Sequence, residues 1–182
     1  MYLIILGPPG AGKGTQSILV AEKLKLKHLS TGEILRQAVT DGTELGLKAK
    51  EVMDSGNLVS DDIMIGIIKD AISNEDAKKG FILDGFPRTL EQARELDKIM
   101  DSLGKDAIRV INLTLDDDEL VRRMLGRGRK DDTEETIKNR LKVYKAQTAP
   151  VREHYGSKSA VFDIYGIGSI NEINENILAV LK

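Results

Sequence analysis

The sequence predicts an α/β protein, a doubly wound parallel sheet of about five strands with helices on both faces. Three observations lead to this prediction. Short apolar runs, first at residues 2–6 and again at residues 81–83, are typical of strands buried on both faces. Segments of helical period separate these runs, which is the rhythm of successive β-α units. Between the first run and the first helical segment lies a glycine-rich stretch, residues 7–15, in the context of a phosphate-binding loop.

The first half of the chain interrupts that rhythm. Its predicted elements are a strand at residues 2–6, a helix at 13–26, a very short strand at 28–30, and helices at 30–39, 43–55 and 61–73. Ser30 and Glu33 have the spacing of a capping box, which opens a helix. Gly56 suits a helix end, and Ser60 is a good N-cap for the helix that follows. Because three helices follow one another without a strand, we expect residues 30–59 to form a helical insert that stands off the core.

The second half returns to alternating strands and helices. It supplies strands at residues 81–83, 108–115 and 160–165, and helices at 89–103, 116–125, from 132 towards 155, and at 169–181. Ser169 and Glu172 have capping-box spacing. Thr89 and Gln92 have the same spacing, so the role of Gln92 could be purely structural. The stretch Asp132-Thr133-Glu134-Glu135 is expected to cap the long helix. Residues 126–132, just before it, form a short, charged, glycine-bearing loop.

Composition sets the broad class of the protein. The chain has 182 residues with 41% hydrophobic content, which suits one α/β core with small inserts. A net charge of −2 gives no sign of a nucleic-acid surface. There are no cysteines, so disulfides and cysteine-ligated zinc are excluded. We find no run of transmembrane length and no basic segment before the first apolar run, so a cytoplasmic protein without membrane contact is expected.

The glycine-rich loop has the Gly-x(4)-Gly-Lys spacing that binds phosphate, in the sequence Gly7-Pro8-Pro9-Gly10-Ala11-Gly12-Lys13-Gly14-Thr15. Glycines let backbone N–H groups turn inward, and Lys13 adds a positive charge near the helix N-terminus. A plain glycine-rich turn is the weaker interpretation in this context. Gly14 stands where the general pattern has a Ser or Thr that ligates magnesium. This departure argues against direct ligation by Thr15, and it favours kinases of small molecules over switch GTPases.

Charged side chains are expected near this loop. Asp84 ends an apolar strand, where a carboxylate can hold magnesium directly or through water, although a turn aspartate is the alternative. Arg88 follows in the turn Gly85-Phe86-Pro87-Arg88, and its guanidinium fork suits phosphate. Further arginines flank the short charged loop at positions 123, 127, 129 and 140. They could form a solvated face, but phosphoryl transfer needs such cations because charge spreads over three oxygens.

Other polar residues have ordinary explanations. His28 and His154 lack the neighbours of a catalytic or metal-binding histidine, so we expect both to be structural. Asp61 and Asp62 are expected only to favour the N-terminus of a helix, and so are residues 116–119.

Taken together, these segments resemble the adenylate kinase family, whose members interconvert ATP plus AMP with two ADP. The resemblance covers essentially the whole chain. Its matching segments are Gly7 to Thr15, Leu29 to Arg36, Gly56 to Val59, Asp84 to Thr89 with Gln92, and Asp131 to Leu141. The phosphate loop alone names only a superfamily, but together with Asp-Gly-Phe-Pro-Arg the set is specific. The short lid without zinc ligands resembles the short form of the family.

The resemblance also implies roles for residues. ATP would be bound by Gly10, Ala11, Gly12, Lys13, Gly14, Thr15, Arg123, Arg127 and Gly168. AMP would be bound by Thr31, Arg36, Asn57, Leu58, Val59, Gly85, Phe86, Pro87, Arg88, Gln92, Arg129 and Arg140. The catalytic cations would be Lys13, Arg88, Arg123, Arg127, Arg129 and Arg140, and Asp84 would hold Mg²⁺ through water. The single kinase domain would consist of a core (1–29, 60–125 and 133–182), an AMP-binding insert (30–59) and a lid (126–132), and a monomer is the family's usual state.

Base specificity rests on two positions. In the similar pyrimidine monophosphate kinases, alanine is usual at the position of Thr31 and asparagine at that of Gln92, so this sequence favours adenine. A UMP or CMP kinase and a non-catalytic nucleotide-binding regulator are the alternatives. No Asn-Lys-x-Asp guanine motif occurs. Asn57, Ser60 and Tyr165 depart from the residues usual in the family.

Overall fold

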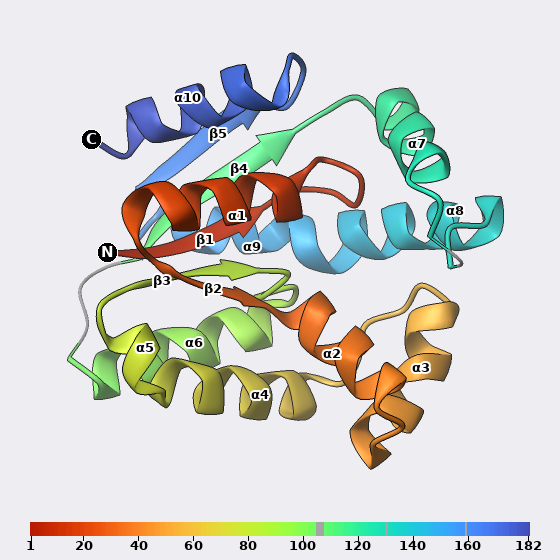
Figure 1. Cartoon of the computed structure of the whole chain (residues 1–182), viewed down its shortest axis with the longest axis horizontal. Coiled ribbons are helices and arrows are strands. Elements are labelled where there is room, and N and C mark those ends of the chain that lie inside the picture. The colour runs from red at the N-terminus through yellow and green to blue at the C-terminus, as the bar shows by residue number, and fades with distance from the viewer. Residues whose placement is uncertain (105–107, 130, 159) are drawn as a thin grey trace.

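The computed structural model describes residues 1–104, 108–129, 131–158 and 160–182. Within these residues, five parallel strands form one sheet in the order β2-β3-β1-β4-β5 (Figure 1). The strands are β1 (Tyr2–Leu6), β2 (Lys27–Ser30), β3 (Phe81–Asp84), β4 (Arg109–Thr114) and β5 (Val161–Tyr165). The predicted α/β fold with a doubly wound parallel sheet is confirmed.

The helices lie close to the predicted segments. They are α1 (Lys13–Leu24), α2 (Thr31–Thr40), α3 (Glu44–Asp54), α4 (Asp61–Ser73), α5 (Glu75–Lys78), α6 (Leu90–Ser102), α7 (Asp117–Gly126), α8 (Glu134–Val143), the π-helix η1 (Tyr144–Thr148), α9 (Ala149–Gly156) and α10 (Ile170–Val180). Ser169 and Glu172 form the predicted capping box, and the Ser30 side chain accepts a hydrogen bond from Glu33 N. Ser60 occupies the N-cap position of α4, but its side chain makes no capping hydrogen bond. The predicted cap is therefore correct in position only.

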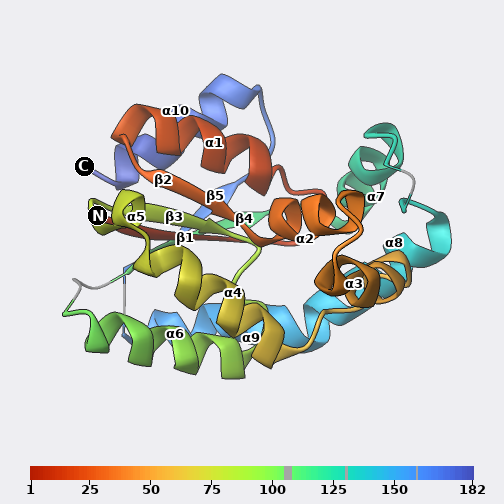
Figure 2. The ribbon, with the colours of Figure 1, turned by 60° about the horizontal axis from the view of Figure 1, so that its bottom comes forward.

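The sheet separates two hydrophobic cores. Ile4 and Leu6 of β1 pack into one core, and Leu3 and Ile5 pack into the other. This follows because successive side chains of a strand point to opposite faces. Helices α1 and α10 cover one face of the sheet, whereas α4, α6 and α9 cover the other (Figure 2). Burial on both faces explains why the strands read as continuous apolar runs.

The long helix predicted from residue 132 towards 155 is divided. The N-cap is Thr133, which lies within the predicted capping stretch 132–135, and its side chain accepts a hydrogen bond from Thr136 N. The π-helix η1 follows α8, and α9 then begins with Pro150 in its first turn. Proline has no N–H and its ring clashes with the preceding helical turn, so a regular α-helix cannot run through this point. The short helix α5 was not expected.

Helices α2 and α3 form a tightly packed insert after β2. Gly46 of α3 lies against the backbone of α2, and a Cβ atom added to Gly46 would lie 2.0 Å from the carbonyl oxygen of Ala38. The C-terminal end of α3 lies against α8, where Asn139 Nδ2 donates to Ser55 O at 2.7 Å and to Asn57 Oδ1 at 3.1 Å (Figure 2). This contact gives Asn57 a structural role through its side chain.

We expect Gly46→Ala to destabilise the insert by about 1–3 kcal/mol, because the two helix backbones must separate. Gly66→Ala is the matched control. Gly66 lies in α4, is exposed and has nothing within 4 Å of an added Cβ, so this change should add about 0.5–1 kcal/mol of stability. Urea unfolding together with hydrogen exchange of residues 31–55 would measure both effects. Equal behaviour of the two variants would contradict the tight packing of α2 on α3.

In the part of the chain that the structure describes, no helix combines the length and the apolar character needed to cross a membrane.

Candidate active site

A cavity of about 810 Å³ opens at the carboxyl ends of the strands. It is lined by the glycine-rich loop, the turn after β3, the insert, and the facing sides of α7, α8 and η1. Ligands of open parallel sheets bind at this edge, where the order of the strands reverses. The cavity therefore brings together segments that lie far apart in the sequence.

The glycine-rich loop connects β1 to α1 as predicted. Gly7, Gly10 and Gly12 have positive φ angles of 139°, 89° and 91°. A Cβ atom on Gly7 would lie 2.6 Å from Leu113 O, so β4 packs directly against the loop. Only glycine can combine this backbone conformation with so close an approach.

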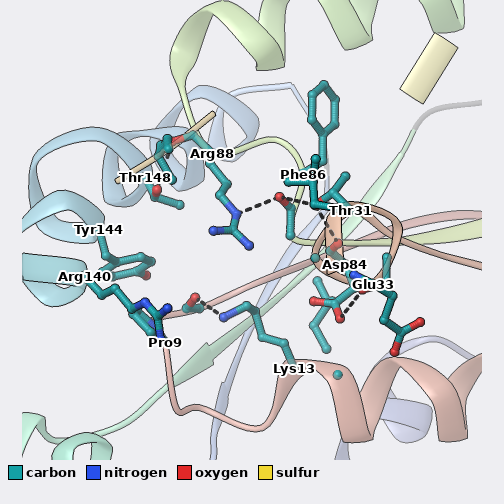
Figure 3. A pocket seen from close by; sticks show the side chains of 18 of the residues that line it. Pro9, Lys13, Thr31, Glu33, Asp84, Phe86, Arg88, Arg140, Tyr144 and Thr148 are labelled. Atoms are coloured by element: carbon teal, nitrogen blue, oxygen red, sulfur yellow. Dashed lines mark hydrogen bonds between the residues drawn. The ribbon is translucent and has the colours of Figure 1, made fainter. Parts of the chain in front are cut away.

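Lys13 folds back over this loop at the floor of the cavity (Figure 3). Its Nζ donates to Gly7 O at 2.8 Å and to Pro8 O at 2.9 Å. Burial lowers the pKa of Lys13 to about 8, although the negative charge of Asp84 opposes this shift. Lys13 is thus a cation held by weak backbone acceptors, which a phosphate group can replace.

The end of β3 carries Asp84 and the turn after it carries Arg88, and both side chains face the cavity that Lys13 also enters (Figure 3). Three hydrogen bonds hold Arg88: its Nε donates to Gly85 O at 2.8 Å, its backbone N donates to Gln92 Oε1 at 2.7 Å, and its carbonyl accepts from Thr148 Oγ1 at 2.9 Å. Burial lowers the pKa of Arg88, with Asp84 acting in the opposite direction. The Nη1 and Nη2 nitrogens of Arg88 face the cavity, in position for an anion (Figure 3).

The Asp84 carboxylate is the candidate metal ligand. Its side chain is 13% exposed, Ser30 Oγ donates to its Oδ2 at 3.5 Å, and His28 Nε2 lies 3.9 Å from the same oxygen. Among the described residues, no three His, Cys, Asp or Glu side chains gather as a metal cage. A lone carboxylate beside a phosphate-binding loop fits Mg²⁺, which keeps several waters and takes its other ligands from substrate phosphates.

The remaining arginines come from α7, α8 and the loop between them, and carboxylates hold three of them. Arg127 and Arg140 both bind Asp132, whose side chain is 1% exposed, with Arg127 Nη2 to Oδ1 at 2.8 Å and Arg140 Nη1 to Oδ1 at 2.6 Å. Arg123 donates to Glu119 at 2.6 Å and to Gly166 O at 2.9 Å. For Arg129, burial and the neighbouring cations Arg127 and Arg36 lower the pKa. All four arginines line the cavity, and Arg127 and Arg129 are at the same time exposed to solvent.

The residues expected to recognise the second nucleotide also line the cavity. Thr31 Oγ1 donates to Gly85 O at 3.0 Å, so its hydroxyl keeps only acceptor capacity for a ligand. Arg36 lies over Gly32, with Nη1 3.1 Å from a Cβ atom added there. Gln92 is 1% exposed, and both ends of its amide are hydrogen-bonded.

Two predicted site residues do not line the cavity. Ala11 is 2% exposed and packs in the hydrophobic core, so only its backbone could serve a ligand. Gly168 precedes the N-cap of α10, where a Cβ would lie 3.2 Å from Glu172 Oε2. The other predicted residues all lie at the cavity, including Asn57, Leu58, Val59, Phe86 and Pro87. Lys130 of the predicted lid lies outside the described residues.

Sequence reasoning missed Tyr144 and Thr148, which also line the cavity (Figure 3). They follow Arg140 at intervals of four residues. In an α-helix, positions four apart drift by about 40° around the axis, and the wider π turn reverses this drift. The π-helix thus keeps Arg140, Tyr144 and Thr148 on one face. The spacing is visible in the sequence, but the π turn is not.

Comparison with known proteins decides the family. A family model described as adenylate kinase matches residues 5–160. The adenylate kinase of Leptospira biflexa serovar Patoc (strain Patoc 1 / Ames) is 50% identical over 180 residues, which cover 97% of each chain. The chain belongs to the adenylate kinase family. The adenylate kinase of Stenotrophomonas maltophilia (strain K279a) is 46% identical, and the alignment covers 100% of both chains. The adenylate kinase of Methanothrix thermoacetophila (strain DSM 6194 / JCM 14653 / NBRC 101360 / PT) is 45% identical, and the alignment covers 100% of this chain and 99% of the relative. The resemblance found in the sequence is confirmed, and the enzymes of this family are phosphotransferases.

Proposed function

We propose that this chain catalyses the reversible, Mg²⁺-dependent transfer of the γ-phosphoryl group of ATP to AMP, giving two ADP and supporting adenine nucleotide homeostasis. The observation that carries this proposal is that Lys13, Arg88 and the arginines from α7, α8 and the loop between them line one and the same cavity. Two nucleotides that meet there bring several negative charges together. The cations offset that repulsion and hold the reacting groups in line.

ATP would lie along the glycine-rich loop. The backbone N–H groups of Gly10 to Thr15 and the N-terminus of α1 suit its phosphates. Lys13 would move from Gly7 O and Pro8 O to the transferring group, while Arg123 and Arg127 hold the adenine and the phosphates. Gly168 would contribute a backbone contact from the loop before α10.

AMP would lie between the insert and the turn after β3. Thr31, Arg36, the backbone of 57–59 and the turn 85–88 would hold it, with Gln92 at the base. Arg88, Arg129 and Arg140 would bind its phosphate and the group in flight. Since Asp132 holds Arg127 and Arg140 before substrate arrives, phosphate must compete with this carboxylate for both guanidinium groups.

The chemistry needs no general base, because the acceptor phosphate is already an anion. Mg²⁺, held through water by Asp84, would neutralise charge on the phosphate oxygens. The insert (30–59) and the short lid (126–132) would close over both nucleotides and exclude water, which would otherwise accept the phosphoryl group. We expect a cytoplasmic protein, since a chain without cysteines needs no oxidising compartment. We expect a monomer, because that is the usual state in the family.

A coupled ADP-production assay with Mg-ATP and, separately, AMP, UMP, CMP, GMP and dTMP tests the proposal. We expect AMP to be the preferred acceptor, because Gln92 and Thr31 suit adenine. Preference for UMP or CMP would leave the fold and mechanism in place but refute the specificity argument. Binding of ATP without transfer to any monophosphate would instead support a non-catalytic regulator.

A further inference from the structure

Asp61 makes contacts that its place at a helix N-terminus does not require. It is the first residue of α4, directly after the insert residues Asn57 to Val59. Its Oδ1 accepts a hydrogen bond from Gln92 Nε2 at 2.8 Å, and its Oδ2 accepts one from Thr89 Oγ1 at 3.0 Å. Both oxygens of Asp61 are therefore committed to the start of α6. The expectation that Asp61 only favours the helix N-terminus is incomplete.

These contacts decide which way the Gln92 amide points. A carboxylate only accepts hydrogen bonds, so the nitrogen of the amide must face Asp61. The backbone N–H of Arg88 only donates, so the oxygen must face Arg88, at 2.7 Å. The two neighbours agree on one orientation. The flipped amide would set two donors against each other at Arg88 and two acceptors against each other at Asp61.

The Gln92 amide has little hydrogen-bonding capacity left for other partners. Its nitrogen carries one N–H beyond the one given to Asp61, and Gln92 is 1% exposed where it lines the cavity. A fixed N–H donor suits the unprotonated ring nitrogen on the pairing edge of adenine. Uracil carries an N–H at the corresponding place, which requires an acceptor. The orientation of the amide therefore discriminates between bases, and a free amide would discriminate less.

We propose that Asp61 is a positioning residue that fixes the Gln92 amide and thereby sets the base specificity of the enzyme. The proposal rests on the proposed role of Gln92 at the AMP base. Thr89 supports the same arrangement, because its Oγ1 donates to Asp61 and also accepts from Gln92 N at 3.2 Å. Since α4 starts where the insert ends, Asp61 also ties the base-recognising side chain to the C-terminal end of the insert.

The test is steady-state kinetics with Mg-ATP and either AMP or UMP. Asp61→Ala should raise the KM for AMP and lower the AMP-to-UMP ratio of kcat/KM by roughly tenfold, within the range of coupling between contacting residues. The KM for ATP and the kcat at saturating AMP should stay unchanged. Asp62→Ala is the matched control, because it removes the same first-turn charge from an exposed side chain and should leave selectivity as it is.

A double-mutant cycle with Gln92→Ala separates positioning from general damage. If Asp61 acts through Gln92, Asp61→Ala should cost no further selectivity once Gln92 is alanine. A selectivity loss that adds to that of Gln92→Ala, or an Asp61→Ala variant as selective as wild type, would overturn the proposal. Failure of the wild type to use AMP would refute the proposed function instead.

A crystal structure of the wild type with AMP bound supplies a test that needs no variant. The Asp61–Gln92 hydrogen bond should persist in that complex, with the remaining amide N–H directed to the base. A Gln92 side chain turned away from Asp61 in the complex would overturn the proposal, even if Asp61→Ala failed to fold.

Discussion

Replacing Arg88 by alanine is expected to lower kcat/KM with AMP by on the order of 10³ or more, as removal of a phosphoryl-transfer arginine does. Arg88 lies opposite Lys13 in the same cavity, and its side chain is half-buried. Before substrate arrives, the hydrogen bond from Nε to Gly85 O orients the guanidinium and two more fix the backbone of Arg88, so less entropy is lost when it binds a phosphate. The coupled assay with varied AMP and saturating Mg-ATP measures the loss.

Two further variants make this prediction specific to the fork of Arg88. Arg88→Lys should recover little activity, because an ammonium cannot donate the paired hydrogen bonds of a guanidinium. Arg94→Ala should have wild-type kinetics, since Arg94 lies on α6 with 60% of its side chain exposed and only a long contact to Glu91 at 3.8 Å. A loss of less than tenfold in Arg88→Ala would remove Arg88 from the catalytic groups.

The parts of the fold that follow from local sequence rules could be predicted. Continuous apolar runs predict strands, because a strand buried on both faces needs apolar side chains at every position. Ser30 and Ser169 mark helix starts, because each caps its helix through a contact with a residue three positions later. The glycine-rich loop is equally local. The π turn at Tyr144–Thr148 is a different case. It lies between α8 and α9, just before Pro150, and no local sequence rule predicts it.

The composition of the cavity could also be predicted, but its hydrogen bonding could not. Motif residues from the loop, the turn after β3 and the arginine cluster converge as expected. Asp132 lies in the predicted capping stretch but is not the cap; its buried carboxylate instead binds Arg127 and Arg140 and acts as their counterion. Asp132 lies only five residues from Arg127 and eight from Arg140, but these pairs join a loop to two helices, so no regular helix or strand spacing predicts them. Tyr165, which has no account in the sequence, donates from Oη to Asp116 Oδ2 at 2.8 Å and so joins the end of β5 to the start of α7.

Replacing Lys13 by methionine is expected to lower kcat/KM for Mg-ATP by on the order of 10² to 10³, because the side chain keeps its length but loses its charge. The charge also predicts a pH effect. In the nucleotide-free protein the Lys13 pKa is about 8, so the amine loses its proton as the pH rises through this value. Bound phosphates favour the ammonium and raise its pKa, so ATP binding above pH 8 should take up a proton and the affinity for ATP should fall.

Calorimetry of ATP binding in buffers of different ionisation enthalpy measures this proton uptake, and it also supplies the controls. Lys13→Arg keeps the charge at every accessible pH, so its ATP affinity should not fall between pH 8 and 9.5. Lys23→Met removes a lysine from the exposed side of the same helix and should retain both the affinity and the proton uptake of the wild type. An ATP affinity that falls equally in wild type and in Lys13→Arg would assign the pH effect to another group. That outcome would mean that burial in the cavity does not lower the pKa of Lys13.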